Sequence, residues 1–141
     1  MSQNNLFLVD DDEDDIYLAR LTFSEHFPDW KLTSFSDGQE LVDYVSEHTT
    51  QPLPDLIILD LNMPRLTGFE ALALLKQNPN WQRIPVAILT TSSSPEDRNR
   101  SEALGACAFM TKPASIDQLA SLITISKLSA ANNTVDSEHN R

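Results

Sequence analysis

The chain has 141 residues, of which 40% are hydrophobic, and this is the length and composition of one ordinary globular domain. Its formal net charge is −11 with only ten Lys and Arg residues, which disfavours nucleic acid as a direct partner because phosphate neutralisation needs clustered positive charge. No apolar run approaches the roughly 18 residues of a membrane-spanning helix, and the first residues contain no basic secretory signal, so we expect a cytoplasmic protein without membrane contact.

Short apolar segments recur along the chain and predict strands. Hydrophobicity that is continuous rather than alternating is typical of strands buried on both faces, as in a parallel sheet. Such runs occupy residues 6–9, 56–59, 86–89 and 108–110. Residues 30–35 are more polar, which favours a strand at the edge of the sheet.

Amphipathic helices are predicted between these strands. Apolar residues three or four positions apart mark one face of each helix. They are Ile16, Ala19, Phe23 and Phe27; Leu41, Val42 and Val45; Phe69, Leu72 and Leu75; and Ile116, Leu119 and Ile123.

Helix boundaries are predicted from capping residues. A side-chain oxygen followed three positions later by an acceptor indicates a helix start. This pattern occurs at Ser36 with Gln39, Thr67 with Glu70, and Ser115 with Gln118. Ser94 followed by Pro95 predicts a further start, and Gly105 and the segment 78–80 predict helix ends.

Five strand–helix units in alternation predict an α/β protein, with helices on both faces of a five-stranded parallel sheet of order 2-1-3-4-5. We place this domain at residues 1–129. Residues 130–141 lack apolar periodicity, so we expect a disordered tail that is too short to be an output domain. Cys107 is the single cysteine, which excludes an internal disulfide, and we expect it to be buried as a small hydrophobe.

Acidic residues follow the first and third predicted strands. Asp10 and Asp11 come directly after residues 6–9, and Asp60 comes directly after residues 56–59. In open parallel sheets the carboxyl ends of the strands form the binding edge. Three carboxylates brought together there repel one another unless a cation joins them, and oxygen-only ligands favour a hard ion such as Mg²⁺. A carboxylate pair that shares a proton is the alternative.

Other polar residues are predicted at the same edge. A carboxylate at a strand tip, such as that of Asp60, is a candidate nucleophile toward a phosphoryl donor. Lys112 follows the fifth strand and would supply positive charge, while the hydroxyl of Thr90 would supply a hydrogen bond. Pro113 restricts the backbone of Lys112 and is compatible with a cis bond that would aim the ammonium along the sheet edge. For Glu13, Asp14 and Asp15 we expect only a solvated first helical turn.

These residues resemble, in order and spacing, the receiver domains of two-component response regulators. The resemblance covers roughly residues 5–128. It rests on the acidic pair, on the stretch from Asp60 to Gly68, on Thr90, and on Phe109 with Lys112-Pro113. It implies a flavodoxin-like doubly wound (βα)5 fold. Stretches such as 36–44, 63–65, 83–85 and 89–92 resemble the small stand-alone receivers associated with phytochromes, some of which form homodimers.

The resemblance also implies roles for individual residues. Asp60 would be the phosphoacceptor, Asp11, Asp60 and the Asn62 backbone carbonyl would ligate Mg²⁺, and Asp10 would act directly or through water. Thr90 and Lys112 would bind the phosphoryl oxygens. Phe109 would be an aromatic switch that turns inward as Thr90 moves, with plain core packing as the alternative. If the acidic run were aligned with the family's acidic pair one residue later, Asp11 and Asp12 would instead be the metal ligands.

We therefore expect a single-domain response regulator that catalyses only its own phosphorylation and dephosphorylation. A sensor histidine kinase or a histidine phosphotransfer protein would be the donor, and an unidentified protein would receive the signal by contact. A haloacid-dehalogenase-type hydrolase would need a second Asp at the position of Asn62, and no phosphate-binding glycine loop is present. A phosphorylation-independent interaction module on the same fold is the remaining alternative.

Overall fold

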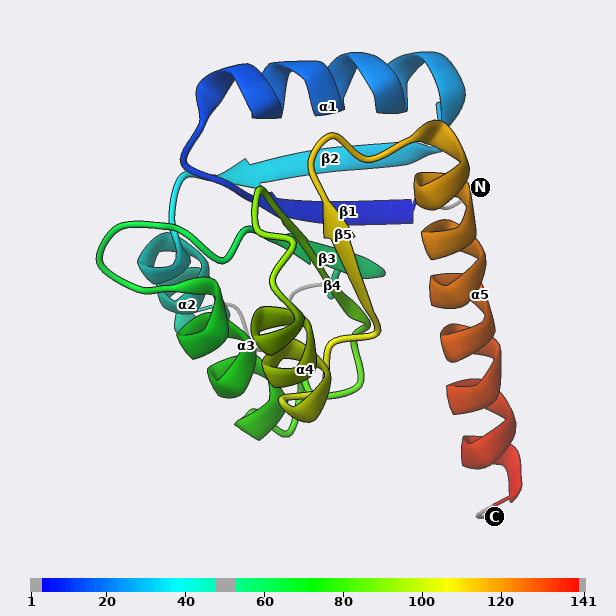
Figure 1. Cartoon of the computed structure of the whole chain (residues 1–141). Helices are drawn as coiled ribbons and strands as arrows, with labels where there is room; N and C mark the ends of the chain where they lie inside the picture. The colour runs from blue at the N-terminus through cyan, green and yellow to red at the C-terminus, as the bar shows by residue number, and fades with distance from the viewer. Residues whose placement is uncertain (1–3, 48–52, 140–141) are drawn as a thin grey trace.

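A computed structural model describes residues 4–47 and 53–139, with side chains up to residue 129. It contains five strands and five helices in strict alternation (Figure 1). The strands are β1 (Asn4–Val9), β2 (Trp30–Phe35), β3 (Leu56–Leu59), β4 (Val86–Thr90) and β5 (Ala108–Thr111). The helices are α1 (Glu13–His26), α2 (Gly38–Glu47), α3 (Gly68–Gln77), α4 (Pro95–Ala103) and α5 (Ile116–His139).

The strands form one parallel sheet in the order β2-β1-β3-β4-β5, which confirms the predicted topology. β2 lies at the edge, as its polarity predicts, and three of its six residues are only half-buried. All four residues of β3 are buried, because this strand is central and both of its faces are covered. Val9 pairs directly with Leu59, so the residues that follow β1 and β3 leave the sheet side by side.

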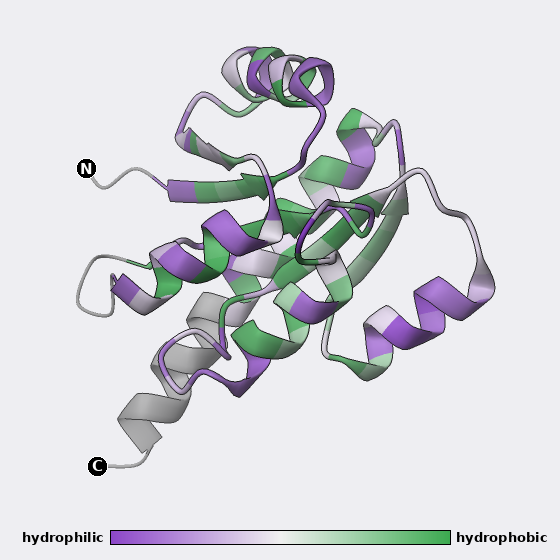
Figure 2. Cartoon of the chain, turned by 90° about the vertical axis from the view of Figure 1, so that its left-hand side faces the viewer, coloured by the Kyte–Doolittle hydropathy of each residue, from purple (hydrophilic) through white to green (hydrophobic). Residues whose placement is uncertain are grey.

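Two hydrophobic clusters cover the two faces of the sheet. One contains Leu41, Leu72 and Leu75 from α2 and α3, and the other contains Phe23 and Leu119 from α1 and α5. Figure 2 shows the strands as an apolar layer between helices with hydrophilic outer faces. Among the helices of the described residues, none has the length and apolar character needed to cross a lipid bilayer.

Most predicted helix starts are confirmed. Thr67 and Glu70 form a reciprocal capping box at α3, Ser115 and Gln118 exchange two hydrogen bonds before α5, and Ser94 caps α4. The predicted start of α2 is wrong by one residue. The carboxylate of Asp37, rather than the hydroxyl of Ser36, accepts the hydrogen bond of the Glu40 amide at 2.8 Å.

Other expectations need correction. Cys107 is exposed rather than buried, because it lies in the turn before β5 and outside both clusters. Ile116 is 45% exposed at the first turn of α5, whereas Leu119 and Ile123 on the same predicted face are buried. The helix α5 extends to His139. The domain boundary at residue 129 and the disordered tail from residue 130 stay predictions. Residues 140–141 lie outside the described residues.

Candidate phosphoacceptor and metal site

Three carboxylates meet at the carboxyl edge of the sheet. Asp10 and Asp11 follow β1 and Asp60 follows β3, and one oxygen from each lies within 4.8 Å of the others. Asp10 and Asp60 are 2% and 6% exposed, whereas Asp11 faces solvent. The structure thus brings together the acidic residues that the sequence analysis expects to meet.

Asp12 has a different position from its two neighbours. Its side chain caps α1 by accepting hydrogen bonds from the backbone amides of Asp14 and Asp15. Its own amide donates to the Oδ1 atom of Asp10 at 2.9 Å, which holds the turn in place. The Asp12 carboxylate is engaged by the first turn of α1 and is not among the three that can share an ion, so the geometry favours Asp11 over Asp12 as a ligand.

Lys112 reaches the cluster from the loop after β5. Its Nζ atom lies 2.8 Å from Asp10 Oδ2, 3.0 Å from Asp60 Oδ2 and 2.8 Å from Asp15 Oδ2. The Lys112–Pro113 peptide bond is cis, and the Lys112 side chain is only 12% exposed. Sequence reasoning missed Asp15, because an acid in a first helical turn is ordinarily solvated and nothing in the local pattern indicates a lysine 97 positions away.

The electrostatics of the site follow from burial and from this lysine. Burial raises the pKa of Asp10, and the neighbouring Asp60 acts in the same direction, although Lys112 and the Asp12 amide oppose both. Burial alone would lower the pKa of Lys112, but hydrogen bonds to Asp10, Asp15 and Asp60 outweigh it and raise the pKa. Lys112 therefore stays charged at neutral pH and provides one fixed positive charge among the carboxylates.

The remaining predicted site residues lie around the cluster. Thr90 ends β4, is fully buried, and accepts a hydrogen bond from the Ser92 amide at 3.4 Å. Its carbonyl accepts from the Lys112 amide at 2.7 Å, so the two residues are joined through the backbone. Asn62 is exposed, and its amide donates to Asp60 Oδ1 at 3.2 Å. Thr91 is exposed and lines a neighbouring cavity.

Phe109 lies on β5 with only 8% of its surface exposed, and it packs in the cluster formed with α2 and α3. The guanidinium carbon of Arg98, on α4, lies 4.9 Å from the centre of its ring. This distance is typical of a cation–π contact. The Phe109 ring therefore lies in the core, and the Arg98 side chain covers it on the solvent side.

The loop between β3 and α3 is attached to α2 by an ion pair that sequence reasoning also missed. The Arg65 Nε atom donates to Asp37 Oδ2 at 3.1 Å, and a second guanidinium nitrogen contacts the same oxygen. Arg65 has φ of 67°, a conformation that costs energy for any residue with a side chain. The ion pair thus contributes to holding the loop that carries Asn62.

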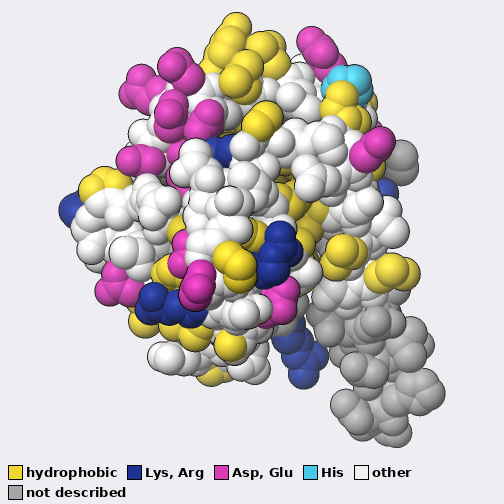
Figure 3. Space-filling view, viewed as in Figure 1, with side chains coloured by type: hydrophobic (Ala, Val, Ile, Leu, Met, Phe, Trp, Pro, Cys, Tyr) yellow, Lys and Arg dark blue, Asp and Glu magenta, His cyan; other side chains and the backbone are white. Residues whose placement is uncertain are grey.

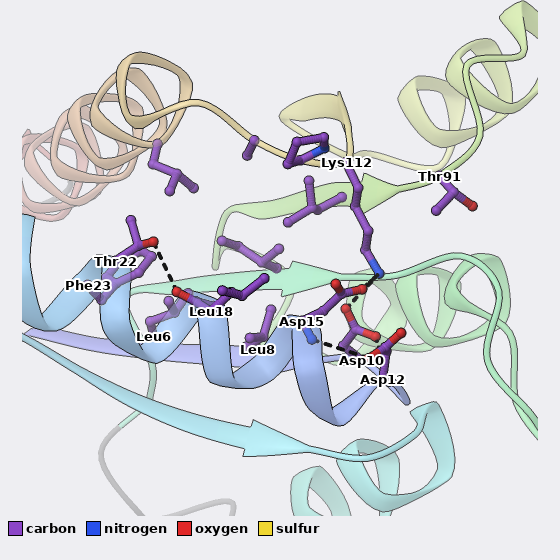
Figure 4. A pocket seen from close by; sticks show the side chains of 16 residues that line it. Leu6, Leu8, Asp10, Asp12, Asp15, Leu18, Thr22, Phe23, Thr91 and Lys112 are labelled. Carbon is purple, nitrogen blue, oxygen red and sulfur yellow. Dashed lines mark hydrogen bonds and ion pairs between the residues drawn. The ribbon is translucent and has the colours of Figure 1, made fainter.

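A cavity of ≈ 560 Å³ opens beside the site, between α1 and the loop that leads into α5 (Figure 4). Its walls are apolar and include Leu8, Leu18 and Phe23, while Asp15 and Lys112 lie at one end. On the molecular surface, Asp and Glu side chains gather around the start of α1 (Figure 3). The site is therefore strongly acidic on its exposed side and apolar along α1.

The donor atoms suit a hard divalent cation. Asp10, Asp11 and Asp60 offer only carboxylate oxygens, and these are close enough for a single ion to join them. Lys112 pairs with Asp10 and Asp60 and so compensates part of their charge independently of an ion. The residues present fit Mg²⁺ or a similar ion.

Comparison with known proteins agrees with this geometry. Residues 6–124 match the family model described as the response regulator receiver domain. The chain belongs to the response regulator receiver domain family. This receiver domain is 34% identical over 121 residues to response regulator Rcp1 of Synechocystis sp., covering 84% of this chain and 82% of Rcp1. It is 33% identical to Protein RcaC of Microchaete diplosiphon, but it spans only 18% of RcaC.

Solved receiver structures are also similar. The Mn(2+)-bound form of Rcp1 has a TM-score of 0.72 at 32% identity, covering 89% of this chain and 88% of Rcp1. The phosphorylated cyanobacterial phytochrome response regulator RcpA has a TM-score of 0.73 at 34% identity, covering 89% of each chain. These matches agree with the resemblance to phytochrome-associated receivers noted in the sequence.

Proposed function

We propose that this receiver domain is a single-domain response regulator that accepts a phosphoryl group on the carboxylate of Asp60. The observation that carries the proposal is the position of Asp60 within 4.8 Å of the oxygens of Asp10 and Asp11. Its Oδ2 atom lies 3.0 Å from the ammonium of Lys112. A nucleophilic carboxylate, a cation site and a lysine in contact are the parts that phosphoryl transfer requires.

The chain's own residues would divide the work of the transfer. Asp60 attacks phosphorus, the bond from phosphorus to the donor atom breaks, and an acyl phosphate forms. Lys112 then binds a phosphoryl oxygen in place of a carboxylate, and Thr90 provides a hydrogen bond from its hydroxyl. The transition state of phosphoryl transfer carries negative charge on the phosphoryl oxygens. Lys112 and Thr90, held in place around these oxygens, would lower the barrier by stabilising that charge rather than by transferring a proton.

In this proposal Asp10, Asp11 and Asp60, with the backbone carbonyl of Asn62, would hold Mg²⁺. The ion supplies positive charge that neutralises the phosphoryl oxygens. Support comes from the oxygen-only donor set and from Rcp1, whose solved structure is described as Mn(2+)-bound. RcpA, a relative at 34% identity, is described as phosphorylated.

The partners follow from the same proposal. A sensor histidine kinase or a histidine phosphotransfer protein in the cytoplasm would be the donor, and the output would be contact with another protein, with a homodimer as one arrangement. Movement of Thr90 toward the phosphoryl group would change the packing of Phe109, which lies on the neighbouring strand. A shift between two packings of this ring would report phosphorylation on the surface around α4 and β5. Catalysis would be limited to the domain's own phosphorylation and dephosphorylation.

The test is the intact mass of the protein after incubation with acetyl phosphate, with and without Mg²⁺. We expect one added phosphoryl group that depends on Mg²⁺ and is absent from Asp60→Asn. Asp55→Asn is the matched control, because Asp55 is an exposed aspartate beside β3 and should not affect the adduct. No adduct on the wild type, together with no binding of beryllofluoride, would contradict the proposal and favour a phosphorylation-independent interaction module.

A further inference from the structure

Asp15 makes a contact that the proposed function does not use. It lies in the first turn of α1, and its Oδ2 atom accepts a hydrogen bond from Lys112 Nζ at 2.8 Å. Its side chain is 37% exposed, so it lies at the rim of the site rather than inside it. It is also outside the group of three carboxylates that are close enough to share an ion.

Lys112 has no free hydrogen-bond donor in this arrangement. An ammonium group has three N–H bonds, and Asp10, Asp15 and Asp60 accept one each. A phosphoryl oxygen can bind Lys112 only if one of these carboxylates leaves it. Asp10 and Asp60 belong to the candidate ion site, and their oxygens have another positive partner when that site is filled. Asp15 has no such second partner in the cluster, so it is the carboxylate that competes with the phosphoryl group.

We propose that Asp15 is a positioning residue that holds Lys112 in the unphosphorylated protein and slows phosphorylation by competing for its ammonium. This inference rests on the proposed function, since it requires that Asp60 accept a phosphoryl group. The contact joins α1 to the loop between β5 and α5 at one end of the ≈ 560 Å³ cavity (Figure 4). Phosphorylation therefore removes a link between α1 and that loop, as Lys112 turns from Asp15 to the phosphoryl oxygens.

The experiment compares Asp15→Asn, Asp15→Glu and the control Asp14→Asn. Asp14 is exposed on the same helical turn, and removing its charge changes the overall field without removing a partner of Lys112. We expect Asp15→Asn to react with acetyl phosphate about two- to fivefold faster than the wild type, which corresponds to the loss of an ion pair that lies partly in solvent. Asp15→Glu should keep the wild-type rate, and Asp14→Asn should be closer to the wild type than Asp15→Asn is.

A second readout needs neither metal nor phosphoryl donor. In EDTA, nuclear magnetic resonance of the Lys112 ammonium should show faster exchange of its protons with water in Asp15→Asn than in the wild type and Asp14→Asn. A residue with only a structural role would lower the melting temperature when replaced and would leave phosphorylation unchanged or slower.

The inference is overturned if the wild type is phosphorylated but Asp15→Asn reacts no faster than Asp14→Asn. Unchanged exchange at Lys112 in Asp15→Asn would also overturn it, because the contact would then not restrain the ammonium. Failure of the wild type to accept a phosphoryl group would instead contradict the proposed function. The outcomes for the two proposals are therefore distinct.

Discussion

Gly68 lies directly against the backbone that carries Asp60. A Cβ atom at position 68 would be 2.8 Å from the Cα atom of Leu61, and it would be closer still to the carbonyl oxygen of Asp60. The Gly68 amide also donates to the Leu61 carbonyl at 3.0 Å. Only a residue without a side chain permits this approach, so the start of α3 defines where the Asp60 loop can lie.

Replacement of Gly68 by Ala should disturb both stability and the candidate ion site. The added methyl group must push α3 away from the end of β3, which we expect to cost about 1–3 kcal/mol in the free energy of unfolding. Urea denaturation measures this change, and Mg²⁺ titration should show weaker binding. Gln77→Ala, an exposed change at the other end of α3, should stay within about 0.5 kcal/mol of the wild type. Equal stability of the two variants would contradict this account.

Asp37 should contribute to stability in a pH-dependent way. Burial disfavours its ionised form, but the Glu40 amide and the Arg65 guanidinium outweigh burial and lower its pKa. A carboxyl group whose pKa is lower in the folded state stabilises the protein above its unfolded pKa of about 3.9, and this contribution is lost as the pH falls toward the folded pKa.

The corresponding measurement uses Asp37→Ala. At pH 7 we expect a loss of about 1 kcal/mol in the free energy of unfolding, since the variant also loses the cap of α2. The difference from the wild type should shrink in unfolding experiments below about pH 4. Ser36→Ala, which leaves the cap intact, should show no comparable dependence on pH. A constant difference at all pH values would show that Asp37 acts only through packing.

Asp11 and Asp12 should respond differently to neutralisation. Asp11 belongs to the group that can share an ion, whereas Asp12 caps α1. We expect Asp11→Asn to weaken Mg²⁺ binding at least tenfold, because one anionic ligand is lost. Asp12→Ala should lower the free energy of unfolding by about 1 kcal/mol and should largely keep the Mg²⁺ affinity. Calorimetric titration and urea denaturation of both variants separate the two roles. A comparable loss of Mg²⁺ affinity in Asp11→Asn and in Asp12→Ala would instead make Asp11 and Asp12 the ligand pair.

The contact between Arg98 and Phe109 should be measurable as a coupling energy. A double-mutant cycle with Arg98→Ala and Phe109→Leu should give about 0.5–1 kcal/mol for the cation–π contact. If Phe109 changes its packing on phosphorylation, this coupling should become smaller with beryllofluoride bound. Asn99→Ala with Phe109→Leu is the control cycle, since Asn99 is exposed on the same helix, and it should give no coupling.

The sheet and the acidic group at its edge were predictable from local patterns. Continuous apolar runs can satisfy their burial only as interior strands, and the residue after each run must then emerge at the carboxyl edge. Asp10, Asp11, Asp60 and Lys112 were placed at this edge in this way, and the strand order brings the three carboxylates together. The capping patterns at Thr67 and Ser115 were equally local, and the structure confirms both.

Contacts between distant surface residues could be learned only from the tertiary structure. The partners of Lys112 and Arg65 depend on how α1 and α2 are placed against the sheet, and Lys112 meets Asp15 across 97 positions. The residues next to a side chain in the sequence contain no information about such distances. We therefore predicted that Asp15 is solvated and that Cys107 is buried. The sequence by itself determined the strands, their order and the acids at their ends, because burial and chain direction impose these. Only the packing of α1 against the sheet decided that Asp15 joins Asp10 and Asp60 around the lysine, because that contact depends on the distance between two elements.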